Sequence, residues 1–289
     1  MEDIYSQLGG CQVSELFDQH YDLNPISHYT MEDRVIDIDI GLKNLEKVTG
    51  GIEAGTIDLI AAPTGVGKTT MSLALAKLQC KLGKKCCYVS TEMNKRDIYK
   101  KIRYCSPDEF ENLTFISLTD NTDINYIVNC IKAIIEVGKF DIIYFDYINS
   151  ATLYYKADRA VPQDQLITIL LQKVRELLDG TKTHITCFSQ TNRMVYTSIP
   201  DQTVIQGSAS AANKVDLGAT LVKCKDKYER WIKKIDSTLE LNILLYVYKN
   251  RASEFVDCFL PLYFDYKYLN VSSGSTIITS DRINWSNIK

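Results

Sequence analysis

Residues 61–70 read Ala-Ala-Pro-Thr-Gly-Val-Gly-Lys-Thr-Thr, and this stretch decides the fold. It follows the apolar run Ile57–Ala61, which predicts a buried strand, and it precedes Met71–Ala76, which continues Lys-Thr-Thr as a helix. A strand, a glycine-containing loop and a helix N-terminus are the setting in which backbone N–H groups bind phosphate. The stretch therefore predicts a phosphate-binding loop.

Each residue type in this loop has its own part in binding a nucleotide. Gly65 and Gly67 allow successive backbone N–H groups to surround a β-phosphate. Lys68 can reach the β and γ oxygens, and the Thr69 hydroxyl can hold Mg²⁺. ATP and Mg²⁺ are the expected cofactors. The predicted nucleotide-binding residues are Ala62, Pro63, Thr64, Gly65, Val66, Gly67, Lys68, Thr69 and Thr70.

Two features of the loop leave an alternative open. The first position of the usual motif is glycine, whereas this chain has Ala62, which still keeps the side chain small. A glycine-rich turn between a strand and a helix could also exist without any ligand.

The composition describes a chain that can bury a full core. It has 289 residues, of which 45% are apolar, and its formal net charge is −3. Because the charge gives no global attraction to nucleic acid, such binding must come from local loops or from a ring that concentrates them. No stretch approaches the roughly 18 uninterrupted apolar residues of a membrane span, and the N-terminus does not resemble a signal peptide. We expect a cytosolic protein without membrane contact.

The cysteines argue against a zinc site. The nine cysteines form no C-x-x-C pair, and only three histidines are present to complete a ligand set. Several cysteines fall in predicted strands, where a reduced cysteine acts as a small apolar side chain.

Predicted strands alternate with predicted helices from residue 40 onward. The strands cover 56–61, 85–90, 113–117, 140–145 and 184–189, and the helices cover 69–82, 95–104, 122–137 and 162–178. This alternation predicts an α/β fold with a mostly parallel central sheet and helices on both faces. Two later strands, 241–249 and 256–266, predict a C-terminal antiparallel hairpin. We expect an N-terminal arm or linker at 1–34, one domain at 35–270 and a C-terminal tail at 271–289.

Polar residues follow three of the predicted strands. Asp146 directly follows the predicted strand 140–145. It can accept a hydrogen bond from a water on Mg²⁺, or it can cap the next turn. Glu92 can orient or deprotonate an attacking water, although a glutamate there also favours a helix start. Gln190 can sense a γ-phosphate or its departure.

Taken in order and spacing, these segments resemble the signature of DnaB-type replicative helicases. Ser-Thr-Glu-Met at 90–93 is similar to the family's Ser-Leu-Glu-Met, and Phe-Asp-Tyr-Ile-Asn at 145–149 is similar to Ile-Asp-Tyr-Leu-Gln. Ser-Gln-Thr-Asn-Arg at 189–193 resembles Ser-Gln-Leu-Asn-Arg, and 41–52 resembles the entry into the family's ATPase domain. The resemblance covers about residues 35–268. It implies a RecA-like P-loop NTPase fold, ATP hydrolysis and a compact phage- or plasmid-type helicase without the family's N-terminal helical domain.

Tyr-Lys-Asn-Arg at 248–251 resembles the family's Lys-Gln-Arg. In that family the lysine and arginine enter the ATP site of the neighbouring subunit, so the resemblance implies that Lys249 and Arg251 act in trans in a hexameric ring. A guanidinium suits this role because the transferring γ-phosphoryl group spreads negative charge. From the residues alone, a solvent-exposed pair at the tip of the hairpin is the alternative.

Residues 204–216, before the next strand, resemble the loop with which the family grips the backbone of single-stranded DNA. Small residues suit this contact because the backbone N–H can approach a phosphate oxygen. Gln206 and Gly207 stand where the family has Arg and Glu, and an ordinary flexible loop is the alternative. A second candidate is 154–159, which carries two tyrosines and two basic residues. The predicted DNA-binding residues are Gln206, Gly207, Ser208, Ala209 and Ser210.

Three functions are compatible with these residues. The leading one is a ring helicase that uses ATP to move on single-stranded DNA and unwind duplex, with a primase or a loader as a further partner. The second is a RecA-like recombinase or regulatory ATPase without processive unwinding. The third is a scaffold subunit that binds nucleotide and DNA without turnover. Fold alone does not separate them.

Overall fold

The computed structural model describes residues 35–37, 40–120, 123–150, 163–191, 209–224, 229, 232–233, 237–238 and 240–279. By its contacts the chain divides into two units, Met1–Arg34 and Val35–Lys289, and every described residue belongs to the second. Within that unit the helices are α3 Lys43–Thr49, α4 Lys68–Lys81, α5 Lys95–Ile102, η4 Pro107–Phe110, α6 Ile124–Ala133, η5 Ile134–Gly138, η6 Ile148–Ser150, α7 Gln163–Leu178 and α8 Ala209–Ala212. The strands are β1 Val35–Asp37, β2 Ile52–Glu53, β3 Ile57–Ala62, β4 Cys86–Ser90, β5 Leu113–Ser117, β6 Ile142–Asp146, β7 His184–Gln190, β8 Leu217–Lys223, β9 Ile243–Asn250, β10 Cys258–Asp265, β11 Asn270–Ser272 and β12 Ile278–Thr279.

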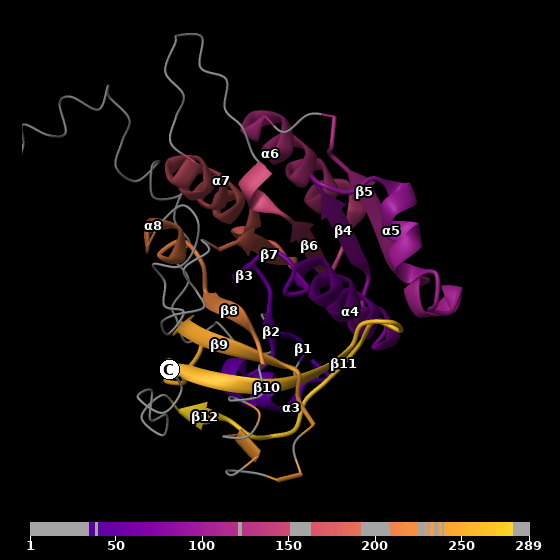
Figure 1. Ribbon diagram of the computed structural model, residues 1–289. Coiled ribbons are helices and arrows are strands. Elements are labelled where there is room, and N and C mark those ends of the chain that lie inside the picture. Colours follow the sequence, from indigo (N-terminus) through magenta and orange to yellow (C-terminus); the bar gives the residue numbers. More distant parts are fainter. Residues whose placement is uncertain are drawn as a thin grey trace, which may run out of the picture. The chain divides into compact units, whose positions relative to one another are not determined.

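Ten of these strands form one mixed sheet. Its order is β11-β10-β9-β8-β3-β7-β6-β4-β5, with β12 paired to β10 (Figure 1). The block from β8 to β5 is parallel, whereas β9, β10 and β11 are antiparallel to their neighbours. The predicted α/β class, the mostly parallel sheet and the C-terminal antiparallel hairpin are confirmed.

The inner parallel strands β3, β4, β6 and β7 are largely buried on both faces, which explains their nearly continuous apolar sequences, whereas the outer strand β5 is partly exposed. Alternate residues of β3 serve two separate cores: Ile60 and Ala62 pack with α3 and α4, while Leu59 and Ala61 pack with α6 and α7. Every residue of β4 and of β6 is buried. The predicted helices therefore cover both faces of the sheet, as Figure 1 shows for α4 and for the pair α6 and α7.

Several predicted boundaries differ from the structure by a few residues. The helix predicted at 122–137 is α6 followed by the π-helical turn η5, after which Lys139 takes a left-handed conformation with φ 49°. The helix predicted at 95–104 ends at Ile102. In the segment predicted as a tail, β11 and β12 pair with β10, so the sheet continues to Thr279. The predicted division into arm, domain and tail stays a prediction.

An irregularity in the pairing of β8 with β9 shapes the end of β9. Gly218 pairs with Lys249 and Ala219 pairs with Val247, which leaves Tyr248 as the extra residue of a bulge. The Tyr248 ring occupies the space beside Gly218, where an added Cβ would lie 2.3 Å from Cε2 of that ring. The bulge therefore requires glycine at this position of β8.

This packing predicts that Gly218→Ala reduces the free energy of unfolding by about 1–3 kcal/mol, because the new methyl group overlaps the half-buried Tyr248 ring. Urea denaturation followed by circular dichroism measures the loss. The cost should persist in a Tyr248→Phe background, which keeps the ring, and should shrink in a Tyr248→Leu background. An equal cost in all three backgrounds would show that the ring is not the cause.

Candidate active site

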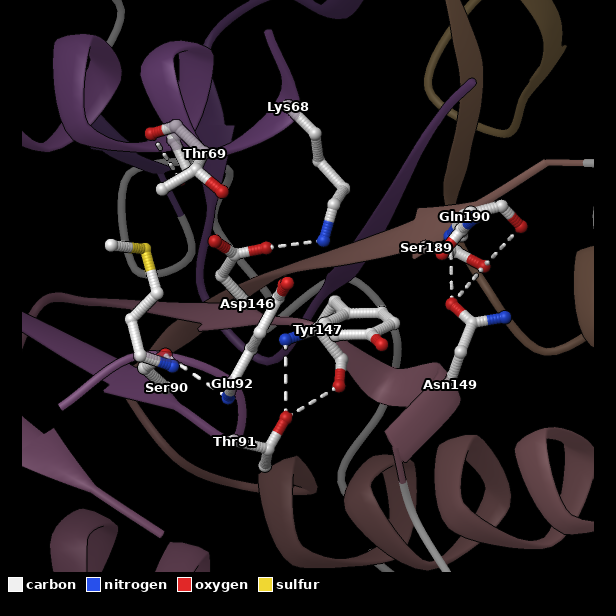
Figure 2. A network of polar contacts seen from close by, with 12 residues as sticks. Lys68, Thr69, Ser90, Thr91, Glu92, Asp146, Tyr147, Asn149, Ser189 and Gln190 are labelled. Atoms are coloured by element: carbon white, nitrogen blue, oxygen red, sulfur yellow. Dashed lines mark hydrogen bonds and ion pairs between the residues drawn. The ribbon is translucent and has the colours of Figure 1, made fainter. Parts of the chain in front are cut away.

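Four loops with polar side chains meet at one edge of the parallel sheet. They follow β3, β7, β6 and β4, which are consecutive neighbours in the sheet, so their carboxyl ends lie side by side. Backbone hydrogen bonds join them: Thr191 N donates to Ala62 O at 3.1 Å, and Thr91 N donates to Asp146 O at 3.1 Å. The phosphate loop, Gln190, Asp146 and Glu92 are thus brought together (Figure 2).

The phosphate loop has the backbone conformation that its glycines allow. Gly65 and Gly67 have φ values of 79° and 110°, in the left-handed region that favours glycine, and α4 begins directly afterwards at Lys68. A Cβ on Gly67 would lie 3.1 Å from Cε1 of Tyr266, so this tyrosine packs against the loop. Residues 62–70 are therefore shaped as a strand, loop and helix N-terminus, the arrangement that binds phosphate.

Lys68 and Asp146 form an ion pair at the centre of this edge. Lys68 Nζ lies 2.6 Å from Asp146 Oδ1, and the two side chains are 12% and 1% exposed. The same ammonium lies 3.8 Å from the centroid of the Tyr147 ring, on which it makes a cation–π contact. Each charge of this shielded pair is therefore compensated by the other.

The second oxygen of Asp146 is held by a chain of hydroxyl groups. Tyr88 donates to Asp146 Oδ2 at 2.8 Å, and its oxygen lies 2.7 Å from Ser72 Oγ. Ser72 Oγ in turn donates to Thr69 O at 2.9 Å. Burial, and then the Asp146 charge, raise the pKa of Tyr88 well above its usual value, so the hydroxyl keeps its proton and donates. This chain connects α4 to β6 and fixes the orientation of the Asp146 carboxylate.

Glu92 is an exposed carboxylate beside this pair. The turn before it is closed by Ser90 Oγ, which accepts from Met93 N at 2.9 Å and from Glu92 N at 3.3 Å. Figure 2 shows the Glu92 side chain extending along the sheet edge on the side of Lys68 and Asp146. Burial of Tyr147 raises the pKa of its hydroxyl, and the Glu92 charge is the second cause of this rise. Glu92 is therefore placed where it can act on a water near the phosphate loop.

Gln190 links β7 to the phosphate loop. Its Nε2 donates to Thr64 Oγ1 at 2.6 Å, and its backbone N donates to Asn149 Oδ1 at 2.7 Å. Ser189 Oγ also donates to Asn149 Oδ1, at 2.9 Å. A change at Thr64 can thus be transmitted through Gln190 to the segment that follows Asp146.

Lys249 and Arg251 lie at the opposite edge of the sheet. The parallel pairing of β8 with β3 and the antiparallel pairing of β9 with β8 place the end of β9 beside the start of β3. The phosphate loop follows the other end of β3, about 17 Å away for a six-residue strand. This separation is longer than an arginine side chain. The structure does not bring Arg251 and Lys249 to the phosphate loop of their own chain.

Contacts within the chain hold both cations at that edge. Lys249 Nζ donates to Ala212 O at 2.6 Å, while Arg251 donates to Asn213 O at 3.0 Å and pairs with Asp216 Oδ1 at 3.0 Å. Burial and the neighbouring Arg251 charge lower the pKa of Lys249 to about 8, against the opposing effect of Asp216. Lys249 therefore loses its charge near pH 8.

Most of the predicted DNA-binding loop lies outside the described residues. Gln206, Gly207 and Ser208 are outside, as is the second candidate stretch, 154–159. Ala209 and Ser210 open α8. Ser210 is exposed, and its Oγ lies 2.9 Å from Thr168 Oγ1 on α7. The predicted contact with DNA stays a prediction.

Thr69 and Asp146 supply oxygen atoms of the kind that Mg²⁺ prefers. In the part of the chain that the structure describes, no group of three or more His, Cys, Asp or Glu residues could hold a metal ion. A magnesium ion here would therefore take its remaining ligands from phosphate oxygens and water, as is usual in nucleotide sites.

None of the described helices has the length and apolar character needed to cross a membrane.

Sequence reasoning missed three residues of this site as contributors. Tyr88 lies inside a buried apolar strand, where it reads as core, and no sequence signal marks its bond to Asp146. Asn149 is the last residue of the Phe-Asp-Tyr-Ile-Asn motif at 145–149. Its contacts with Ser189 and Gln190 arise only because β6 and β7 are neighbours in the sheet. Tyr266 reaches Gly67 across almost 200 positions of sequence.

Comparison with known proteins supplies further matches. Residues 37–109 match the family model described as the DnaB-like helicase C terminal domain. The sequence is 46% identical over 57 residues to the DNA repair and recombination protein RadB of Methanobrevibacter smithii. The matched stretch is 20% of this chain and 24% of that protein. The sequence is 35% identical over 77 residues to the DNA repair protein RadA of Campylobacter jejuni. That stretch is 27% of this chain and 16% of that protein. The matches thus span about a quarter or less of these curated relatives.

Solved structures with the same fold cover most of the chain. A DnaB-like replicative helicase, described with its interactions with primase, has a TM-score of 0.67 and 18% identity, over 90% of this chain and 70% of that one. A second structure, described as an ATPase domain, has a TM-score of 0.65 and 18% identity, over 84% and 93%. A KaiC-like protein of Pyrococcus horikoshii has a TM-score of 0.58 and 14% identity, over 83% and 98%. The family match therefore concerns residues 37–109, and the likeness to these solved structures shows that the chain shares their fold.

Proposed function

We propose that this protein is an ATP-driven ring helicase that moves on single-stranded DNA and unwinds duplex during replication. The observation that carries the proposal is the division of the site between the two edges of one sheet. Lys68, Asp146 and Glu92 lie at one edge, and Lys249 and Arg251 lie at the other. A complete site therefore needs two chains, and repetition of this head-to-tail contact closes a ring, which we take to be hexameric.

The residues at the phosphate-loop edge have distinct roles in the proposed reaction. With ATP bound, Lys68 would contact its β and γ oxygens in place of Asp146, and Asp146 and Thr69 would hold Mg²⁺. Bound Mg²⁺ neutralises charge on the phosphates. Glu92 orients and deprotonates the attacking water. Gln190 reports the presence of the γ-phosphate through its contact with Thr64.

The neighbouring chain supplies the remaining charge. Arg251 stabilises the negative charge of the transferring phosphoryl group, and Lys249 assists it. The segment 206–210 of each subunit contacts the backbone of single-stranded DNA in the centre of the ring. A primase or a loader is a natural further partner, and the cytoplasm is where such a protein meets its DNA.

A second function is favoured by one specific observation. The two curated relatives that share short stretches with this chain, RadB and RadA, are both named as proteins of DNA repair. A RecA-like recombinase or regulatory ATPase would hydrolyse ATP on DNA without separating strands. A nucleotide-binding scaffold subunit would bind DNA without turnover.

ATP hydrolysis measured with and without single-stranded DNA, beside displacement of a labelled strand from a forked duplex, tests the proposal. A helicase is expected to show hydrolysis that DNA stimulates, together with ATP-dependent strand displacement. Stimulated hydrolysis without displacement would instead support the recombinase or regulatory function. Absence of hydrolysis in an assembled, DNA-bound protein would leave the scaffold function.

The roles of Lys68 and Glu92 predict different defects. Lys68→Ala should lose both nucleotide binding and turnover, because Lys68 contacts phosphate in the ground state. Glu92→Gln should retain ATP binding and lose turnover by about two to four orders of magnitude, since it acts mainly on the water. Fluorescent-nucleotide binding and phosphate release measure the two effects. Glu111→Gln, at an exposed position on another loop, is the matched control and should keep parent activity. Parent turnover in Glu92→Gln would mean that another carboxylate is the base.

Catalysis in trans predicts complementation between two inactive variants. Arg251→Ala has an intact phosphate loop, and Lys68→Ala has an intact finger, so an interface that combines the two is competent. Mixed rings should regain part of the hydrolysis that neither parent shows, whereas Arg96→Ala, at an exposed site on α5, should be active without mixing. The mixture is assayed without DNA, where one inactive site stalls its neighbours least. If labelled subunits exchange and no ratio restores hydrolysis, Arg251 does not act in trans.

A further inference from the structure

Three cationic side chains bind three successive carbonyl groups at the end of α8 and in the turn after it. Lys249 donates to Ala212 O, Arg251 to Asn213 O and Arg175 to Lys214 O, at 2.6, 3.0 and 2.7 Å. Two of these cations come from the end of β9 and the third from α7. The last residues of α8 and the turn that follows are therefore fixed to β9 and to α7. This turn comes directly after the segment proposed to contact DNA.

Asp216 is the one carboxylate among the described residues that joins both arginines. Its Oδ1 accepts from Arg175 Nη2 at 2.7 Å and from Arg251 Nη1 at 3.0 Å. Its Oδ2 accepts from the backbone N of Ile57 at 3.0 Å. Burial alone would raise the pKa of Asp216, but the bonds from Arg175, Ile57 and Arg251 outweigh it and hold the pKa below its usual value. The carboxylate is therefore charged when it binds the arginines.

These contacts fix the Arg251 guanidinium without using all of its donors. A guanidinium has five N–H donors, and within the described part of the chain Arg251 engages one with Asp216 and one with Asn213. Further donors remain for another acceptor, and the side chain is 46% exposed. Asp216 and Asn213 thus fix the Arg251 guanidinium, and part of it still faces solvent. This edge of the sheet is the one opposite the phosphate loop of the same chain.

We propose that Asp216 is a positioning residue for the arginine finger: it holds the Arg251 guanidinium in the orientation that reaches the phosphates bound by the neighbouring subunit. This inference rests on the proposed function, in which Arg251 acts in trans. It adds a residue that acts on the reaction only through Arg251.

A purely structural role explains the Asp216–Arg251 pair less well. Arg175 and the Ile57 backbone already anchor Asp216 to α7 and β3. An ion pair whose arginine is nearly half exposed contributes little to stability. The Asp216–Arg251 contact is therefore best explained by the orientation that it gives to the guanidinium, because a guanidinium must be aligned to bind phosphate at two points.

Asp216→Asn tests the proposal in assembled protein. It keeps an oxygen for Ile57 N and removes the charge that orients Arg251. The rate constant kcat for ATP hydrolysis is expected to fall about 10- to 100-fold, as for a misplaced catalytic group, while KM for ATP changes less than about threefold. Arg175→Lys keeps a charged donor beside Asp216, so that Asp216 stays anchored, and it should stay within about threefold of parent kcat. Equal losses in both variants, accompanied by a lower thermal midpoint, would show that Asp216 is only structural.

Combination with Arg251→Ala provides a readout that a structural role would not move. Asp216→Asn should cause no further loss of kcat in the Arg251→Ala background, because no finger is left to position. Asp216→Asn subunits should also regain hydrolysis when mixed with Lys68→Ala subunits, and not when mixed with Arg251→Ala subunits. Full additivity of the two losses would overturn the inference.

Failure of the inference and failure of the proposed function give different results. If Arg251→Ala and Lys68→Ala complement each other and Asp216→Asn hydrolyses ATP at the parent rate, Asp216 has no positioning role and catalysis in trans stands. If Arg251→Ala and Lys68→Ala do not complement despite subunit exchange, the ring proposal fails first, and the positioning role fails with it.

Discussion

The whole arrangement depends on the direction in which strands pair with β3. Because β7 and β8 run parallel to β3, the loops that leave β3 and β7 emerge at the same edge, with Ala62 opposite Gln190. Because β9 runs antiparallel to β8, the end of β9 returns to the other edge. Strand direction alone thus separates the phosphate loop from Lys249 and Arg251. No rearrangement of loops could reunite them within one chain while the sheet stays intact.

The Lys68–Asp146 pair keeps the phosphate-loop edge of the sheet organised. A buried carboxylate without a partner would be costly, and here its two oxygens are satisfied by Lys68 and by Tyr88. The Tyr147 ring shields the ammonium from the other side. The same charges that stabilise one another here are those that a nucleotide with its metal ion would compensate separately. Exchange between the two states therefore leaves no buried charge without a partner.

The sequence predicted the fold and the phosphate-loop edge well because both follow from local patterns. Apolar runs, a helical period and a glycine-lysine-threonine loop are visible in single segments, and β3, β4, β5, β6 and β7 begin within two residues of their predicted positions. Tyr88 and Asp216 could not be found in this way, since their roles come from partners far along the chain. Asp216 reads in the sequence as the last residue of a loop. Its contacts appear only once α7, β3 and β9 converge on it.

The spacing of Lys249 and Arg251 acquires a physical meaning from the structure. Lys249 near the end of β9 and Arg251 directly after it both point to the end of α8 and the turn that follows, whereas Asn250 between them points the other way. There the Asn250 side chain donates to Val48 O at 2.8 Å, and Ser253 Oγ donates to the same carbonyl at 2.6 Å. The end of β9 is therefore clamped on both faces, by α3 on one side and by the turn after α8 on the other. In the proposed function, a finger on such a base presents its cations to a neighbouring subunit with little further loss of side-chain entropy, because contacts within its own chain already restrict these side chains.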